Sequence, residues 1–123
     1  MKTPDQNHPI TITPAQHRVR IVHHGEVVAD SRRALALKEA SYPVVYYVPR
    51  EDATMRLLAR TDHSTHCPYK GDAAYYTINA GDPAAANAVW SYEAAYPAVS
   101  AISGHLAFYP QKVDAIELLP LNE

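Results

Sequence analysis

The sequence contains little cysteine, and it has no excess of charge of either sign. A single cysteine, Cys67, excludes a disulfide within the chain and gives no sign of an oxidising compartment. The formal net charge is -2, and the chain lacks the clustered Lys and Arg side chains that non-specific nucleic-acid binding requires. No apolar run approaches membrane-spanning length, and Met1–His8 has no apolar signal core. We therefore expect a cytoplasmic protein that binds neither nucleic acid nor membrane.

Several motifs of catalysis and metal binding are also absent. There is no glycine-rich phosphate loop, no Gly-x-Ser-x-Gly elbow and no His-Glu-x-x-His pair. A structural zinc site usually needs four ligands in paired clusters, and the chain has no Cys-x-x-Cys. His63 and His66 lie near Cys67, but they are better explained as incidental turn residues. We expect no metal site and no cofactor.

Ten prolines and several β-branched or aromatic runs predict a mainly β domain of 17–123, preceded by an extended arm of 1–16. Proline interrupts regular structure, so short elements are expected. Two short helices are expected, one from Arg50 to Leu58 and one from Tyr96 to Gly104. The segment 60–63 is expected to be a return loop. The expected strands are Ile10–Ile12 in the arm, the hairpin Val19–His23 and Glu26–Asp30, then Ala34–Glu39, Val44–Val48, Ala73–Asn79, Asn87–Tyr92, Leu106–Tyr109 and Ala115–Leu119.

Residues 34–39 also suit a helix, because Ala, Leu, Lys and Glu all favour one; the shortness of the run favours a strand. In Ala73–Asn79, alternation predicts Tyr75 on one face of the strand and Tyr76 on the other. Packing of these elements is expected to give a meander, a roll or a pair of packed sheets.

Two cations at the ends of predicted strands suggest a binding site. Lys70 lies in the turn Thr65–Gly71, and Arg50 follows the strand Val44–Val48. Side chains of this kind bind carboxylates and phosphates, although both could be solvated surface charges. Glu39 is a candidate partner or proton carrier, or forms a salt bridge to Arg50. Asp52 is a candidate ligand-binding acid, or the first-turn acid of a helix.

An aromatic wall is expected beside these cations. Trp90, Tyr47 and Tyr76 could line a box for a flat or cationic ligand, although a lone Trp is often simply core. The leading interpretation is therefore a domain that binds a small anionic or flat molecule, with no reaction assigned.

Two other function classes stay open. An enzyme could use Cys67 as nucleophile or Lys70 as base or Schiff-base former, with Glu39 as a further catalytic candidate. A free Cys is more often a small buried hydrophobe, and adjacent residues of an extended chain point to opposite faces, so His66 is poorly placed as its base. Alternatively, the tyrosines could form the surface of a homodimer.

Five motifs resemble one bacterial family over about residues 19–114. They are Ala29-Asp30-Ser31, Pro49-Arg50-Glu51-Asp52, Cys67-Pro68-Tyr69-Lys70-Gly71, Ala88-Val89-Trp90-Ser91-Tyr92 and Gly104-His105-Leu106-Ala107-Phe108-Tyr109. The chain is similar to domain of unknown function 427, which also carries a nucleotidyltransferase-like label. The resemblance implies a β-tent-like fold of two small antiparallel sheets packed at an angle. It carries over as site positions, without roles, Glu39, Arg50, Asp52, Cys67, Lys70 and Trp90.

The transferase label does not fit the residues. A nucleotidyltransferase site needs a Gly-Ser turn and two metal-binding acids alternating on a strand, and neither occurs here. Asp114 and Glu117 are three residues apart, which is the wrong period for one face of a strand. Relatives of the fold include zinc-bearing proteins, but this sequence lacks their paired cysteines.

Overall fold

The computed structural model describes residues 1–122, and within them ten strands form three antiparallel sheets. The first sheet has the order β1 (Ile10–Pro14), β4 (Leu35–Glu39), β5 (Val45–Tyr47). The second has the order β10 (Ala115–Leu119), β2 (Arg18–His23), β3 (Glu26–Ser31). The third has the order β6 (Leu58–Cys67), β7 (Gly71–Ile78), β8 (Ala85–Ser91), β9 (Ala107–Phe108). The expectation of a mainly β domain is confirmed.

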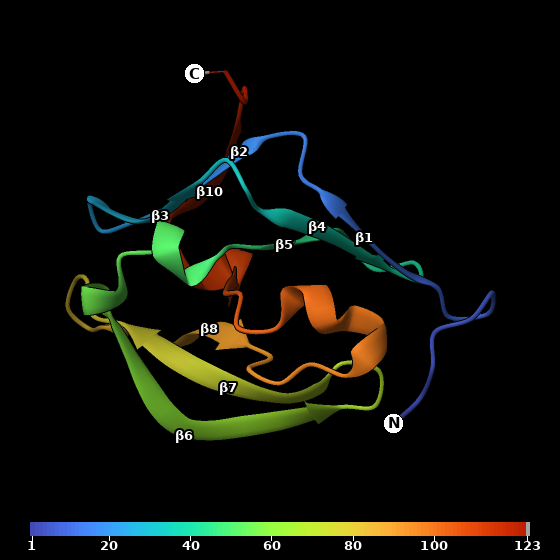
Figure 1. The fold of residues 1–123 in the computed structure, drawn as a ribbon. Helices are drawn as coiled ribbons and strands as arrows, with labels where there is room; N and C mark the ends of the chain where they lie inside the picture. The colour runs from blue at the N-terminus through green and yellow to red at the C-terminus, as the bar shows by residue number, and fades with distance from the viewer. Residues whose placement is uncertain (123) are drawn as a thin grey trace.

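The structure has three sheets where two were expected. A long two-stranded ribbon, in which β1 and β2 run against β4 and β3, is interrupted in the middle and so contributes to two separate sheets. The pairing of β1 with β4 ends at Pro14 and Leu35, and the backbone N–H of Ala15 still donates to the Ala34 carbonyl at 2.9 Å. The ladder resumes only at Val19 and Ser31, between β2 and β3. Figure 1 shows the two halves as two slopes above the third sheet. The strands of this ribbon were predicted, but its bend was not.

Local patterns account for the predicted hairpin and for the two-sided strand β7. His24 and Gly25 both have positive φ, 47° and 74°, which suits the two-residue turn between β2 and β3. Along β7, Tyr75 packs into one buried cluster and Tyr76 into the other, as alternation predicted. The side of β7 that carries Tyr75 faces the candidate site described below.

The two expected helices are wrong as regular helices, since the chain forms only short 3-10 turns there. They are η1 (Arg50–Asp52) and η2 (Met55–Leu57) in the first segment and η3 (Pro97–Ile102) in the second. A further short turn, η4 (Pro110–Lys112), lies outside both. Between η1 and η2, Ala53 bridges to Ala29 and the N–H of Thr54 donates to the Val28 carbonyl at 2.8 Å. A helix through this point would lose that pairing with β3. Within η3, Val99 leaves the helical region at φ -125°.

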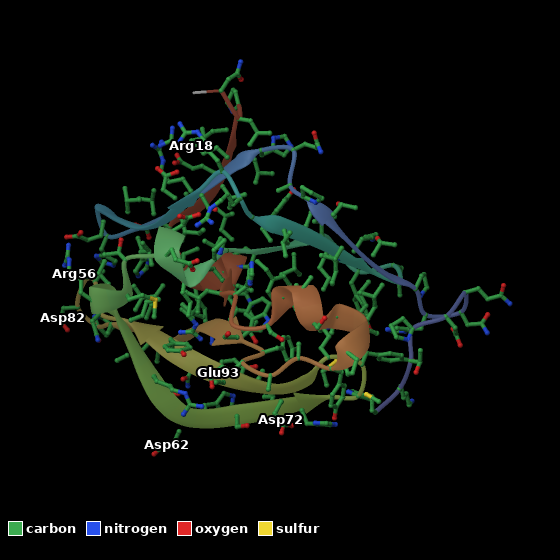
Figure 2. All side chains as sticks on the ribbon, in the orientation of Figure 1. Arg18, Arg56, Asp62, Asp72, Asp82 and Glu93 are labelled. Carbon is green, nitrogen blue, oxygen red and sulfur yellow. The ribbon has the colours of Figure 1, made fainter. Side chains whose placement is uncertain are left out.

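The segment expected to be a return loop is instead the longest strand. β6 runs for ten residues at the edge of the third sheet, paired with β7 on one side. Most of its side chains are exposed, and the pairing shifts register between Arg60 and Ser64. Figure 2 shows Asp62 projecting from it, away from the rest of the molecule. A polar strand that is exposed on both faces has no apolar alternation by which to recognise it.

Two buried clusters hold the sheets together. The larger joins β2 and β3 to β7 and β8, and includes Val19, Val28, Ile78 and Val89. The smaller joins the first sheet to the third, and includes Leu37, Tyr47, Tyr75 and Tyr92. Among residues 1–122, no helix has the length and apolar character needed to cross a membrane.

Candidate functional site

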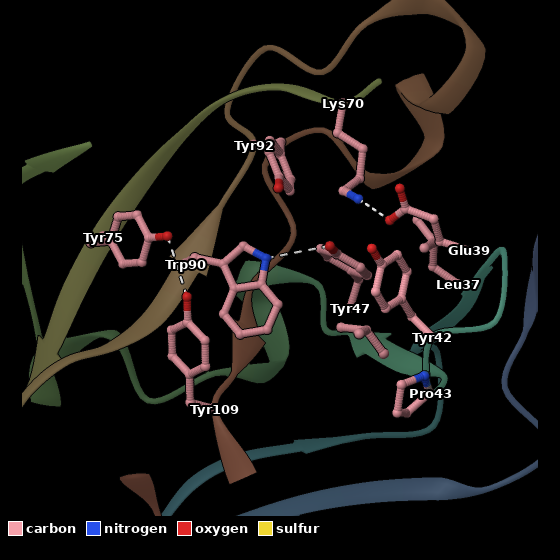
Figure 3. Close-up of a pocket in the computed structure, with 11 residues that line it drawn as sticks. Leu37, Glu39, Tyr42, Pro43, Tyr47, Lys70, Tyr75, Trp90, Tyr92 and Tyr109 are labelled. Carbon is pink, nitrogen blue, oxygen red and sulfur yellow. Dashed lines mark hydrogen bonds and ion pairs between the residues drawn. The ribbon is translucent and has the colours of Figure 1, made fainter. Parts of the chain in front are cut away.

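A cavity of about 190 Å³ lies where the first and third sheets meet, beside the smaller buried cluster. Its walls come from β4, β5, β7 and β8, from the turn after β6 and from the connection between β4 and β5. Figure 3 shows the lining side chains turned toward a common space. They are Leu37, Glu39, Tyr42, Pro43, Val45, Tyr47, Lys70, Tyr75, Trp90, Tyr92 and Tyr109. We call this space the Lys70 cavity.

The charged part of the cavity wall is an ion pair between Lys70 and Glu39, which His8 of the N-terminal segment also contacts. The Lys70 ammonium donates a hydrogen bond to Glu39 Oε1, and the other carboxylate oxygen lies 2.8 Å from Nε2 of His8 in the N-terminal arm. Lys70 is only 8% exposed, and the Glu39 side chain 13%. Buried charges of this kind must be paired, and here the two partners satisfy each other.

Neighbouring groups fix the positions of this pair. The His8 ring stacks on Tyr69 at 4.0 Å between centroids, which holds the arm against the turn that carries Lys70. The Lys70 carbonyl accepts a hydrogen bond from the N–H of Tyr96 at 3.0 Å, and its ammonium lies 5.8 Å from the centre of the Tyr92 ring. The lysine is thus held in place by both its backbone and its side chain.

Glu39 stays ionised in this setting. Burial alone would raise the pKa of Glu39, but the hydrogen bonds from Lys70 and His8 outweigh it and hold that pKa below its ordinary value. Each oxygen of the carboxylate therefore has a partner, Lys70 on one side and His8 on the other.

Aromatic side chains form the remaining walls and hydrogen-bond to one another. The indole Nε1 of Trp90 donates to the Tyr47 hydroxyl at 3.3 Å, and the two rings meet edge to face. The hydroxyls of Tyr75 and Tyr109 lie 3.3 Å apart, and Trp90 lies 4.5 Å from Tyr109 between centroids. Ring pairs of this geometry stabilise a rigid wall.

Several tyrosine hydroxyls face the Lys70 cavity. Burial raises the pKa of Tyr47 and of Tyr92 far above the ordinary value, and that of Tyr109 to about 12. These hydroxyls are therefore protonated at neutral pH. Since Tyr47 accepts from Trp90, its own proton can be donated elsewhere. Figure 3 shows the hydroxyls of Tyr42, Tyr47 and Tyr92 turned toward the same space as the Lys70 ammonium.

The structure does not bring Arg50 or Tyr76 to the Lys70 cavity. The Arg50 guanidinium donates to the hydroxyls of Tyr76 at 2.9 Å and Ser91 at 3.3 Å, and lies 3.3 Å from Glu93. Glu93 also binds Arg60 at 2.9 Å. The sequence interpretation grouped Arg50 with Lys70 because both follow strands. The alternation of β7 separates them, since Tyr76 faces away from Tyr75 and the cavity.

Asp52 is likewise held outside the cavity lining. Its carboxylate accepts from Ser31 Oγ at 2.6 Å and from Arg33 at 3.2 Å. Burial opposes ionisation, but these hydrogen bonds lower the pKa of Asp52 below its ordinary value. The residue therefore joins η1 to the end of β3. The alternative salt bridge of Glu39 to Arg50 is wrong, because Glu39 pairs with Lys70 and His8.

Cys67 packs beside the smaller buried cluster rather than lining the Lys70 cavity. It is half-buried as the last residue of β6. The adjacent His66 binds Asp72 at 2.7 Å, on the exposed surface. Within residues 1–122, no group of three or more His, Cys, Asp or Glu side chains gathers to hold a metal ion. Cys67 thus packs as a small side chain at the edge of the smaller buried cluster.

Several lining residues were not anticipated from the sequence. Tyr75 could have been chosen over Tyr76 only if the face of β7 that meets the first sheet had been known. His8, which binds Glu39 without lining the cavity, lies in an arm with little pattern. Alternation in the expected strand Asn87–Tyr92 places Tyr92 on the face of Trp90, but Tyr42 and Tyr109 had no such link to the candidate site. Nine tyrosines with few other aromatics were the available signal, since tyrosine suits a wall with a polar tip.

Comparison with known proteins supports the resemblance noted from the motifs. Residues 11–118 match the family model described as domain of unknown function (DUF427), which covers most of the chain. A search of curated proteins found no match to this sequence.

Proposed function

The chain belongs to the domain of unknown function 427 family, and we propose that it binds a small flat acid in the Lys70 cavity. The observation that carries the proposal is a lysine that is 8% exposed, in the wall of a cavity otherwise lined largely by aromatic rings. The ligand's carboxylate would lie against the Lys70 ammonium, and its ring against Trp90.

The cavity offers more hydrogen-bond donors than acceptors. An ammonium has three donors, and only one of those of Lys70 is used by Glu39. Tyr47 has a free proton because its oxygen accepts from Trp90. The one carboxylate, Glu39, is already used by His8 and Lys70. A complementary ligand must therefore be rich in acceptors, and a carboxylate meets that need best.

Size and shape favour a small planar molecule. Drug-sized ligands use pockets of roughly 300–1,000 Å³, so a cavity of about 190 Å³ suits a single ring with its acidic group. Trp90, Tyr47 and Tyr109 provide the flat faces and edges against which such a ring packs. The engagement of the Lys70 amine with Glu39 favours binding over covalent chemistry as its role.

The only tryptophan of the chain lines this cavity, so its fluorescence reports binding directly. The probes are benzoate, nicotinate and 2-furoate, with benzamide as a neutral planar control and acetate as an acid without a ring. We expect a saturable change in Trp90 fluorescence with at least one planar acid. A thermal shift should accompany it, because a ligand of the native state stabilises that state.

Substitution of Lys70 tests the assignment. Lys70→Met should weaken binding of the planar acid by at least tenfold, whereas Lys2→Met removes the same charge from an exposed position and should leave binding unchanged. Circular dichroism checks that both variants are folded. The proposal fails if none of the planar acids binds the wild-type chain, or if the folded Lys70→Met variant binds as tightly as wild type.

A further inference from the structure

A second, apolar cavity of about 70 Å³ adjoins the Lys70 cavity. Its walls are mostly hydrocarbon and come from β2, β5, β8, β10, the connection before β5 and the region around β9. They are Val19, Ile21, Val44, Val45, Tyr46, Trp90, Phe108, Pro110 and Ile116. We call this space the Val44 cavity.

The two cavities share the side chains of Val45 and Trp90. The connection between β4 and β5 also borders both, with Tyr42 and Pro43 on the polar side and Val44 on the apolar side. Trp90 and Val45 therefore form the wall between the two cavities, and a ring that packs on Trp90 in the Lys70 cavity would lie next to that wall.

The mouth of the Val44 cavity is exposed and apolar. Val44 is 43% exposed, and Leu118 on β10 is 45% exposed. Leu118 lies two residues beyond the lining residue Ile116, so the two side chains share a face of the strand. Leu118 is also paired in register with Val19, another lining residue. Removing exposed apolar surface of this kind from water is favourable in free energy.

We propose that the natural ligand of the Lys70 cavity carries a short apolar substituent, which occupies the Val44 cavity. This inference rests on the proposed function of the Lys70 cavity and specifies its ligand further, as an alkyl-substituted planar acid. A cavity of about 70 Å³ holds roughly two to three heavy atoms, at ~30 Å³ for a water-sized group. An ethyl group fits this limit, whereas a long chain does not.

The test compares benzoate with 3-ethylbenzoate and 4-ethylbenzoate, titrated against Trp90 fluorescence. Each buried methylene contributes enough that two carbons should tighten binding about tenfold for the better-placed isomer. The two hydroxymethylbenzoates serve as polar controls of similar length, and they should gain little.

Val44→Asp places a charge at the mouth of the Val44 cavity. Val27→Asp is the matched control, because Val27 is 45% exposed and does not line either cavity. We expect Val44→Asp to remove the tenfold ratio between ethylbenzoate and benzoate affinities, measured within the one variant so that any general effect of the added charge on anion binding cancels. Val27→Asp should retain the advantage.

The two proposals fail in different ways. If benzoate binds through Lys70 but neither ethyl isomer binds more tightly, the Val44 cavity is not a subsite, and the proposed function stands. The same conclusion follows if the ethyl advantage survives in Val44→Asp. If neither benzoate nor the ethylbenzoates bind the folded wild-type chain, both proposals are overturned for planar benzoic acids.

Discussion

At the scale of single residues, Glu39 is the centre of the site, because both of its oxygens are used. One accepts from Lys70, and the other contacts His8. An interior ion pair of this kind costs desolvation energy and is balanced only while both partners are present. Loss of one partner leaves the other charge buried and unsatisfied.

Glu39→Gln should therefore destabilise the protein by about 3 kcal/mol, because Lys70 would keep its charge without its carboxylate. The measurement is the free energy of unfolding from urea titration. Glu117→Gln is the control, since Glu117 pairs with Arg20 at 2.7 Å on the surface. That exposed pair should contribute no more than about 1 kcal/mol. Equal losses in the two variants would contradict the buried role of Glu39.

The lowered pKa of Glu39 also predicts how stability depends on pH. A carboxyl whose pKa is lower in the folded state than in the unfolded state binds its proton more readily after unfolding. Its contribution is fully present above the ordinary value of 4.5 and is lost as the pH falls through the folded value. Asp30, Asp52 and Glu93 have lowered pKa values too and act in the same direction.

We expect the urea midpoint of the wild-type chain to fall between about pH 5 and pH 3. Glu39→Gln should show a shallower decline over the same range, because one of the contributing carboxyls is gone. Midpoints measured at several pH values in one buffer series give both slopes. Parallel slopes would mean that Glu39 titrates alike in the folded and unfolded states.

At the scale of elements, two turns from different sheets meet. A Cβ placed on Gly81, in the turn between β7 and β8, would lie 2.4 Å from Cγ of His24, in the turn between β2 and β3. Gly81 also has φ +84°, which disfavours any side chain. This close approach of the two turns, together with the positive φ, explains why position 81 is occupied by glycine.

Gly81→Ala should cost roughly 3 kcal/mol, because backbone strain adds to a steric clash. Gly25→Ala is the matched control, with φ +74° but nothing within 4 Å of the added Cβ. It should cost only roughly 1 kcal/mol, the backbone part alone. In a double-mutant cycle, His24→Ala should relieve most of the difference. Additive effects in that cycle would show that the two turns do not press on each other.

The strands most readily predicted were those with alternating burial or with β-branched and aromatic residues. β2 buries every second residue, and the run Val44–Val48, which contains β5, is β-branched and aromatic throughout. β6 shows neither pattern, so its polar residues were taken for a loop. The expected helix after Arg50 failed because Thr54 binds the Val28 carbonyl of a distant strand, which local propensity cannot reveal.

At the scale of the whole molecule, the site depends on which faces the sheets turn toward one another. Lys70, Glu39, Tyr47 and Trp90 were chosen from the sequence and lie around one cavity. Arg50, Tyr76 and Asp52 were chosen by the same reasoning and lie outside its lining. Residue type and position at a strand end identify candidates, but only the packing of one sheet on another decides which of them meet.

The N-terminal segment belongs to this packing. β1 pairs with β4 over Ile10–Pro14, and His8 contacts Glu39. A chain that begins at residue 17 would lack β1, so the edge of β4 would be exposed, and it would also lack His8, a hydrogen-bond partner of Glu39. We expect its Tm to fall by ~10 °C or more. A chain that begins at residue 5 keeps both features and should fall by only a few degrees. Thermal unfolding followed by circular dichroism distinguishes them, and equal Tm values would contradict a structural role for β1.

The three-way contact at Glu39 has a consequence for the order of folding. His8 lies 31 residues before Glu39, and Lys70 lies 31 residues after it. Each contact closes a long loop, whose entropy cost is met only after nearer contacts have formed. The β2–β3 and β6–β7 hairpins can therefore assemble while Glu39, Lys70 and His8 are still apart. A partly folded chain would have much of its β-structure and no Lys70 cavity, because that cavity forms only where the first sheet meets the third.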